Sequence, residues 1–250
     1  NALDVAVDKK VLVDTLMSGF GSVINGPLPP KSIESESGGA VTSEEQIEKA
    51  REILVKAGWK AGDDGVFTKT VKKEPKRLAF SLVTGNAPEV KRAAELVAAN
   101  WKTMGADVEL KFFEQNDLNQ NVIRPRKYDA LLFGEVVGRD LDLFAFWHSS
   151  QRNDPGLNIA LYANIDTDRE LAEARMIDDP VARRKKAEEA ALEISKETAA
   201  VFLYAPHFVY LTQGVSGIEL GSLSTPSDRF ANVDRWYLET EHVWPIFNSQ

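Results

Sequence analysis

The residues best suited to contact a ligand follow an apolar run in the middle of the chain. Residues 130–133 are apolar, and residues 134–151 then combine glycines, acidic residues, an arginine and aromatic residues. A buried strand that ends in such a loop is typical of a binding site, because loops carry the groups that recognise ligands. The residues that we predict to form the site are Glu135, Val136, Val137, Gly138, Arg139, Asp140, Asp142, Phe144 and Trp147.

The charged residues of this segment each have two interpretations. Arg139, beside two carboxylates, either pairs with them or recognises an anionic group of a ligand. Asp140 and Asp142 could act as a general acid and base. In a loop bounded by glycines, the stronger interpretation of Asp142 is a cap for a helix that starts near Leu143, because carboxylates satisfy free N–H groups at a helix start.

The aromatic residues also have a structural and a functional interpretation. Phe144, Phe146 and Trp147 have the spacing of a short helix, where aromatic side chains most often supply core packing. An aromatic ring exposed at a cleft would instead form an apolar wall for a ligand. We expect most of these rings to lie in the core, with Phe144 or Trp147 behind the cleft wall formed by residues 135–142.

A catalytic interpretation is the main alternative. A fragment of an α/β hydrolase or transferase could use His148 with Asp140 or Asp142. However, Ser149 and Ser150 lie in no Gly-x-Ser-x-Gly motif, and neighbours in sequence do not have the geometry of a catalytic triad. The three histidines of the chain are isolated from one another, and it contains no cysteine. We therefore expect no metal site, no cofactor and no enzymatic activity.

Alternating patterns of strand and helix place the segment at the edge of a sheet. Apolar alternation and helical periodicity predict a strand at 78–83, a helix at 88–104 and a strand at 108–112, then a short helix at 116–123 and a strand at 128–134. This order favours parallel strands joined by right-handed crossovers. Ligands of such sheets bind at the carboxyl ends of the strands, where the 134–142 loop begins.

The rest of the chain predicts further helices and a strand-like region. A helical pattern covers residues 2–17, and Gly19 and Gly21 end it. A second helix is predicted to begin at Ser43 with a capping-box pattern and to end at Gly58. Two more helices are predicted at 167–177 and 180–196, and residues 200–212 are strand-like. A chain that starts inside a helix suggests a piece cut from a larger protein.

Composition restricts the class of protein. The chain has 250 residues, 43% hydrophobic content and a net charge of −8, so it can bury a sizeable core and repels nucleic-acid backbones. We expect no nucleic-acid partner. No apolar run reaches the length of a membrane span, and the first residues lack the pattern of a signal peptide.

Several motifs, in order along the chain, resemble those of the family 5 extracellular solute-binding proteins. The similarity covers essentially the whole chain, and its motifs lie at residues 2–10, 25–30, 50–59, 138–142, 146–151 and 162–164. It maps onto the carboxyl-terminal half of such proteins. The resemblance implies an α/β fold, one lobe of a type II periplasmic-binding-protein-like receptor that closes on its ligand, with a mixed sheet and flanking helices.

The resemblance also implies a domain organisation and partners. Residues 1–213 would form the ligand-binding lobe, and residues 214–250 would return to a missing amino-terminal lobe, which would house the aromatic residues at 236–238 and 243–247. The partners would be a peptide or small-molecule ligand and the permease subunits of an ABC transporter. We expect a monomer in the periplasm or outside the cell, with a lipid anchor as an option. A rival interpretation makes the aromatic tail a dimer patch.

This chain departs from the pattern of the peptide-binding family members at a position that contacts the ligand. Peptide-binding members of the family hold the amino terminus of the peptide with an aspartate, and our alignment puts Arg139 at that position. Asp140 is the next residue and could substitute, but an arginine would oppose a cationic amine. The family also takes up sugars, opines and nickel complexes, so the resemblance implies the receptor class more firmly than a peptide ligand.

Overall fold

The computed structural model describes residues 1–30, 42–138, 140–221 and 225–238. Two compact units divide the chain, residues 1–207 and residues 208–250. The α/β class is confirmed. Among the described residues, no helix has both the length and the apolar character needed to cross a membrane.

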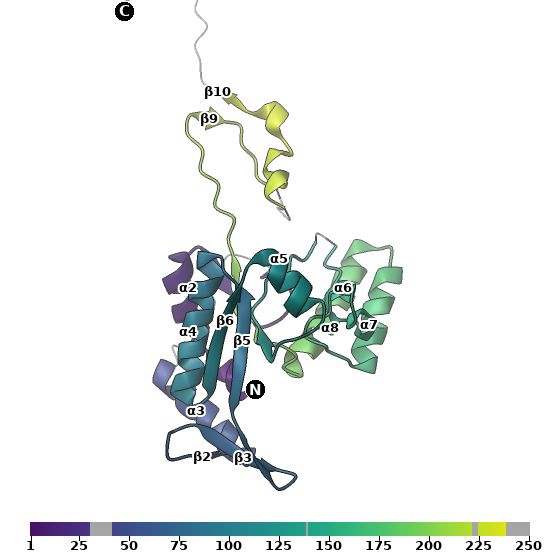
Figure 1. The fold of residues 1–250 in the computed structure, drawn as a ribbon. Helices are drawn as coiled ribbons and strands as arrows, with labels where there is room; N and C mark the ends of the chain where they lie inside the picture. Colours follow the sequence, from purple (N-terminus) through teal and green to yellow (C-terminus); the bar gives the residue numbers. More distant parts are fainter. Residues whose placement is uncertain (31–41, 139, 222–224, 239–250) are drawn as a thin grey trace, which may run out of the picture. The chain divides into compact units, whose positions relative to one another are not determined.

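A parallel sheet is the framework of the first unit (Figure 1). Strand β5 (Ala79–Gly85) lies between β6 (Asp107–Phe113) and β7 (Ala130–Leu131), and both neighbours are parallel to it. Helix α4 (Pro88–Met104) connects β5 with β6 and packs against both strands. Parallel pairing is therefore confirmed.

Local sequence explains the bounds of α4. Pro88 is the first helical residue, where its missing N–H costs nothing, and Gly105 ends the helix with a φ of 112°. The apolar face contains Ala94, Val97 and Met104, all buried. Its predicted range, 88–104, is confirmed.

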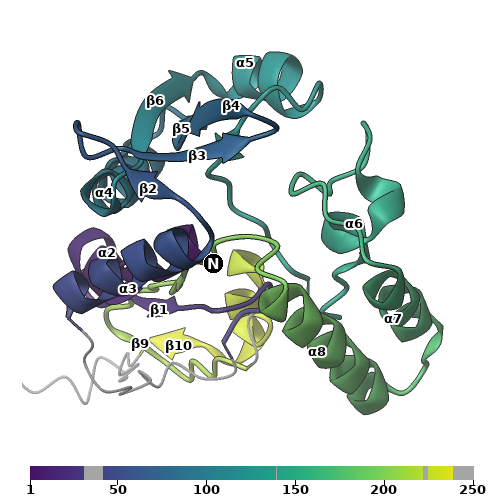
Figure 2. The same cartoon turned by 90° about the horizontal axis from the view of Figure 1, so that it is seen from below.

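The main core lies between α4, β5 and β6 and the first helices of the chain. Helices α1 (Ala2–Val5) and α2 (Lys9–Met17) pack with α3 (Ser43–Lys56) and α4, as Figure 2 shows. The indole N–H of Trp101 donates a hydrogen bond of 2.8 Å to the Leu3 carbonyl. The single helix predicted at 2–17 is wrong, because Asp8 caps a new helix by accepting a hydrogen bond from the Val11 N–H.

A small antiparallel sheet precedes β5. It contains β2 (Lys60–Ala61), β3 (Phe67–Val71) and β4 (Glu74–Arg77), in the order β2-β3-β4. A two-residue turn, Lys72 and Lys73, joins β3 to β4. Strand β4 leads directly into β5.

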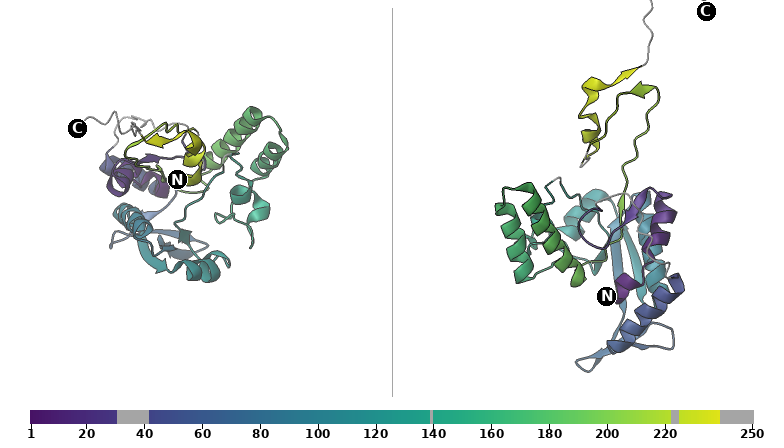
Figure 3. Two further views of the ribbon diagram at one scale, coloured as in Figure 1. Left: turned by 90° about the horizontal axis from the view of Figure 1, so that it is seen from above. Right: turned by 180° about the vertical axis from the view of Figure 1, so that it is seen from behind.

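A second core lies among the later helices. Helices α6 (Phe144–Trp147), α7 (Ile165–Met176) and α8 (Pro180–Lys196) contribute to it, and α7 and α8 lie side by side in Figure 3. A short 3-10 helix, η2 (Ser149–Gln151), follows α6. After β6 come α5 (Gln115–Asp117) and the π-helix η1 (Leu118–Ile123), where a short α-helix at 116–123 was predicted.

Two predicted strands are much shorter than expected. The strand predicted at 128–134 is limited to Ala130–Leu131, although the Leu132 N–H still donates to the Val83 carbonyl. In the strand-like region 200–212, only β8 (Tyr204–Pro206) is a strand, and it pairs with β1 (Gly21–Val23). Apolar residues near these strands pack in the cores without joining a sheet.

The second unit is small and rich in aromatic residues. Strand β9 (Val215–Ser216) pairs with β10 (Tyr237–Leu238), and the 3-10 helices η3 (Pro226–Phe230) and η4 (Val233–Arg235) lie between them in sequence. The unit begins at residue 208, close to the predicted boundary at 213/214. The assignment of this tail to a second lobe stays a prediction, and residues 243–247 lie outside the described residues.

Candidate functional site

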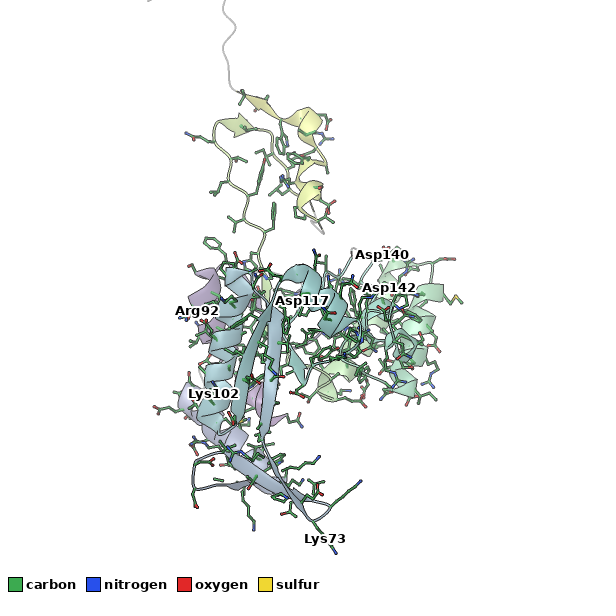
Figure 4. The ribbon with its side chains drawn as sticks, in the orientation of Figure 1. Lys73, Arg92, Lys102, Asp117, Asp140 and Asp142 are labelled. Atoms are coloured by element: carbon green, nitrogen blue, oxygen red, sulfur yellow. The ribbon has the colours of Figure 1, made fainter. Side chains whose placement is uncertain are left out.

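The carboxyl ends of the parallel strands carry a group of polar residues at one edge of the sheet. Strand β5 ends at Gly85 and is followed by Asn86, while β6 ends at Phe113 and is followed by Glu114. The side chains of Asn86 and Glu114 form a hydrogen bond. Figure 4 shows Asp117, Asp140 and Asp142 at the end of this unit opposite Lys73.

Asn86 and Glu114 are candidates that the sequence analysis missed. Ligands of parallel sheets bind at the carboxyl ends of the strands, and this rule selects Asn86 after β5 and Glu114 after β6 as well as the loop after the last strand. Their hydrogen bond joins two strand ends at the edge from which the 134–142 loop also leaves. We add them to the candidate site for this reason.

The 134–142 loop alternates between exposed and partly buried residues. Val136 is 78% exposed, and Gly138 and Asp140 are also exposed. Glu135 and Val137 are partly buried, and Val137 packs against the second core. Arg139 lies outside the described residues. The loop therefore has an open side at Val136, Gly138 and Asp140.

Asp142 fixes the end of the loop to two helices. Its carboxylate accepts a hydrogen bond of 3.0 Å from the Phe144 N–H, in agreement with the capping interpretation, and bonds of 2.9 and 2.7 Å from the Arg175 guanidinium. Burial raises the pKa of this carboxyl, but the hydrogen bonds from Arg175 and Phe144 and the charge of Arg175 together lower it below 3.8. Asp142 is therefore a structural anchor of the loop.

Asp140 lies in a more open position. Its carboxylate is 3.8 Å from the Arg183 guanidinium, and its side chain is 77% exposed. It lines a shallow hollow of about 290 Å³ formed with Leu141, Pro180, Val181, Arg183 and Arg184. Arg183 also donates hydrogen bonds to the carbonyls of Ile177 and Asp178. Asp140 thus remains accessible to a ligand.

Glu135 differs from both aspartates because it forms no ion pair with a described residue. Among the described residues, no cationic side chain forms an ion pair with it, whereas Asp140 and Asp142 each lie beside an arginine. Burial raises the pKa of Glu135 from 4.5 to about 7, and the Trp147 indole N–H opposes this rise. That N–H forms no hydrogen bond with an acceptor among the described residues, so its opposing effect is weak.

The aromatic residues belong to the second core. Trp147 is 2% exposed, and its ring centroid lies 6.1 Å from that of Tyr162 and 5.6 Å from that of Phe202. Phe144 stacks on His148 at 4.1 Å and lies beneath the Arg175 guanidinium at 3.9 Å. These two rings can support the loop from behind, and their contact with a ligand stays a prediction.

His148 is not paired with Asp140 or Asp142. Its Nδ1 accepts a hydrogen bond of 3.1 Å from the Ser150 N–H and lies 4.0 Å from the Asp168 carboxylate. The Ser149 hydroxyl donates to Asp168 instead of to His148. A nucleophile and its base need a hydrogen bond to each other, and these side chains do not form one. Among the described residues, no group of three or more His, Cys, Asp or Glu could hold a metal ion.

Comparison with known proteins gives a family and a set of relatives. The profile of the bacterial extracellular solute-binding proteins, family 5 Middle, matches residues 1–156. The chain is 27% identical over 242 residues to the oligopeptide-binding protein AppA of Bacillus subtilis, covering 95% of this chain and 43% of AppA. It is 32% identical over 215 residues to protein XP55 of Streptomyces lividans, covering 84% of this chain and 36% of XP55.

Solved structures show the same fold. The structure of AppA in complex with a nonapeptide matches 96% of this chain and 47% of its own, with a TM-score of 0.71 and 26% identity. The structure of NikZ from Campylobacter jejuni in complex with Ni(L-His) matches 94% of this chain and 47% of its own, with a TM-score of 0.69 and 24% identity. The chain spans about half the length of the relatives that it matches.

Proposed function

Because this chain belongs to the bacterial extracellular solute-binding proteins of family 5, we propose that it supplies one lobe of a receptor that delivers a solute to an ABC importer. The receptor binds a peptide or a related small solute by closure of a cleft, without covalent chemistry. The observation that carries this proposal is the match to the family profile over residues 1–156, which includes the 134–142 loop at the carboxyl edge of the sheet.

The loop supplies one wall of the cleft in this proposal. Glu135, Val136, Val137, Gly138, Arg139, Asp140 and Asp142 form the wall, with Phe144 and Trp147 behind it. The open side of the loop supports this assignment, because Val136 is largely exposed and Asp140 is accessible. Asp142 positions the wall through Arg175 and Phe144.

Glu135 has the most direct role in solute binding. Its partly buried carboxyl has no cationic partner among the described residues, so a positive group of the solute would compensate the charge that burial makes unfavourable. A free amine meets this requirement. Glu135 could thus perform the function that the aspartate has in peptide-binding relatives, even though Arg139 occupies the position that we align with it.

We propose that the solute is a peptide or a similar small molecule. AppA is an oligopeptide-binding protein, and the NikZ structure contains Ni(L-His). The two ligands differ, but both are small solutes that carry amine or carboxylate groups. We propose the periplasm or the outer cell surface as the location, with permease subunits as partners and the monomer as the working form.

Titration of the intact protein with short peptides tests the site. Calorimetry should show saturable binding, and Glu135→Gln should weaken it by about tenfold or more, because a charge-assisted contact to an amine is lost. Glu52→Gln removes the same charge from the exposed face of α3 and should leave binding unchanged. Equal affinity of wild type and Glu135→Gln would refute the assigned role of Glu135.

A turnover assay distinguishes the receptor from the enzyme alternative. Peptides and other candidate solutes should be recovered unchanged after incubation with the protein. Conversion of a solute to product, abolished by His148→Ala, would instead establish an enzyme and overturn the proposed function.

A comparison of the isolated chain with the longer protein tests the two-lobe proposal. Cleft closure requires contacts from both lobes, so residues 1–250 alone should bind the solute much more weakly than the intact protein. Equal affinities of the two forms would show that one lobe is sufficient.

A further inference from the structure

The β3–β4 hairpin has a positive charge that contrasts with the acidic chain. Residues 67–77 contain five basic residues, Lys69, Lys72, Lys73, Lys76 and Arg77, and one acidic residue, Glu74, whereas the whole chain has a net charge of −8. The hairpin therefore presents a local positive potential on a protein that otherwise repels anions.

Most of this charge has no ion-pair partner among the described residues. Arg77 forms an ion pair of 2.7 Å with Asp64. The side chains of the four lysines of the hairpin form no hydrogen bond or ion pair with any described residue, and those of Lys72, Lys73 and Lys76 are exposed. Three exposed cations are thus available to an external partner, and the partly buried Lys69 lies beside them.

The lysines occupy positions where the hairpin would be more stable with other residues. Lys72 and Lys73 have φ values of 51° and 72°, the conformation of a type I′ turn, which prefers Asn-Gly. Lys69 lies directly opposite Lys76, and like charges at such a position are unfavourable. Local stability does not explain these residues, and each of them adds positive charge.

The surface of the hairpin lacks the apolar groups of a protein interface. No large hydrophobic residue between residues 56 and 132, all of which are described, is strongly exposed. Protein interfaces depend on a buried apolar or aromatic centre, which the hairpin does not offer. The cations also lie on the turn and on one face of the strands, an arrangement suited to a layer of mobile anions.

We propose that the β3–β4 hairpin binds the anionic phospholipid surface of a membrane. Each lysine near such a surface contributes favourable electrostatic energy. This energy decays with distance over the Debye screening length, which is about 8 Å at physiological salt. The interaction needs no insertion, in keeping with a turn that exposes no apolar side chain. It is reversible and sensitive to salt.

The position of the hairpin is compatible with solute binding. Strand β4 runs into the amino-terminal end of β5, whereas the 134–142 loop and Asn86 lie at the carboxyl ends of the parallel strands. Figure 4 shows Lys73 at the opposite end of the unit from Asp140 and Asp142. A hairpin bound to a bilayer therefore leaves the solute loop open to solution.

Vesicle co-sedimentation of the full chain tests the proposal. The wild type should bind vesicles that contain phosphatidylglycerol, should not bind vesicles of phosphatidylcholine alone, and should dissociate at high salt. The double variant Lys72→Asn/Lys73→Gly keeps the type I′ turn while it removes two charges. Its partition should fall by roughly thirtyfold, since each lysine near the surface is worth about fivefold.

A matched variant separates the hairpin from net charge. Lys102→Gln/Lys185→Gln removes two exposed charges from α4 and α8 and should bind the vesicles as the wild type does. An equal loss in this control would overturn the proposal, as would failure of the wild type to bind anionic vesicles. Tighter binding to an acidic protein or an oligonucleotide than to the vesicles would also overturn it. Peptide calorimetry on Lys72→Asn/Lys73→Gly should be unchanged, which keeps this test independent of the solute site.

Discussion

The segment from Ala79 to Phe113 and the 134–142 loop differ in the forces that hold them. Strands β5 and β6 and helix α4 bury a continuous apolar core, in which Val97, Trp101 and Met104 are almost fully buried. The loop is held instead by the hydrogen bonds and charge of the Asp142 carboxylate, and it also carries the partly buried Glu135, whose ionisation the fold disfavours. Apolar burial changes little with pH, whereas carboxylates titrate. The framework should therefore set the overall stability, and the loop its dependence on pH.

The largest effect should come from breaking the framework. Trp101→Ala removes a buried ring and its hydrogen bond to Leu3, and should lower the free energy of unfolding by about 3–5 kcal/mol. Val136→Ala in the loop should change it by about 0.5 kcal/mol or less, because Val136 is 78% exposed. Urea unfolding followed by circular dichroism measures both. Similar losses in the two variants would refute the division between framework and loop.

An intermediate effect should come from Glu135. Its pKa in the folded protein, about 7, lies above the ordinary value of 4.5, so the ionised carboxylate destabilises the fold. The stability of the wild type should fall as the pH rises from about 4.5 to 7. Glu135→Gln should remove this fall and be more stable than the wild type by about 1–2 kcal/mol near pH 8, after allowance for partial exposure.

Unfolding measured across this pH range checks the prediction for Glu135. Near pH 4 the two proteins should be equally stable, because Glu135 is then protonated in both the folded and the unfolded states. Glu52→Gln, on α3, provides the control for loss of a surface charge. A wild-type stability that is constant across the window would show that the fold does not disfavour the charge of Glu135.

The framework was predictable because its signals are local. Pro88 and Gly105 mark the two ends of α4, and the apolar spacing between them specifies the buried face. Alternation of strand and helix was sufficient to predict parallel pairing. Local patterns failed where a single side chain changed the outcome, as at Asp8, which starts a second helix within the predicted one.

The contacts of the candidate site depend on residues far apart in sequence. Asp142 pairs with Arg175, which lies 33 residues later, and no spacing rule connects the two. The interpretation of Asp142 as a cap succeeded because its partner, Phe144, is two residues away. The raised pKa of Glu135 results from the burial of its side chain, and the sequence of a polar loop does not show which side chains are buried. Its carboxyl became conspicuous once its surroundings were known.

The smallest effects should come from Asp142, where two substitutions separate its two contacts. Asp142→Asn keeps an oxygen for the Phe144 N–H but removes the charge that faces Arg175, and should cost about 0.5 kcal/mol because the pair is partly exposed. Asp142→Ala loses both contacts and should cost about 1–1.5 kcal/mol.

The pKa of Asp142 is lowered in the folded protein, so its charge stabilises the fold above about pH 4 and loses this effect as the pH falls through the lowered value. The difference between wild type and Asp142→Asn in urea unfolding should therefore disappear in acid, whereas most of the difference between Asp142→Asn and Asp142→Ala should remain. A difference between wild type and Asp142→Asn that persists in acid would mean that Asp142 holds the loop by shape and hydrogen bonding rather than by charge. Charge would then not distinguish the loop from the apolar framework.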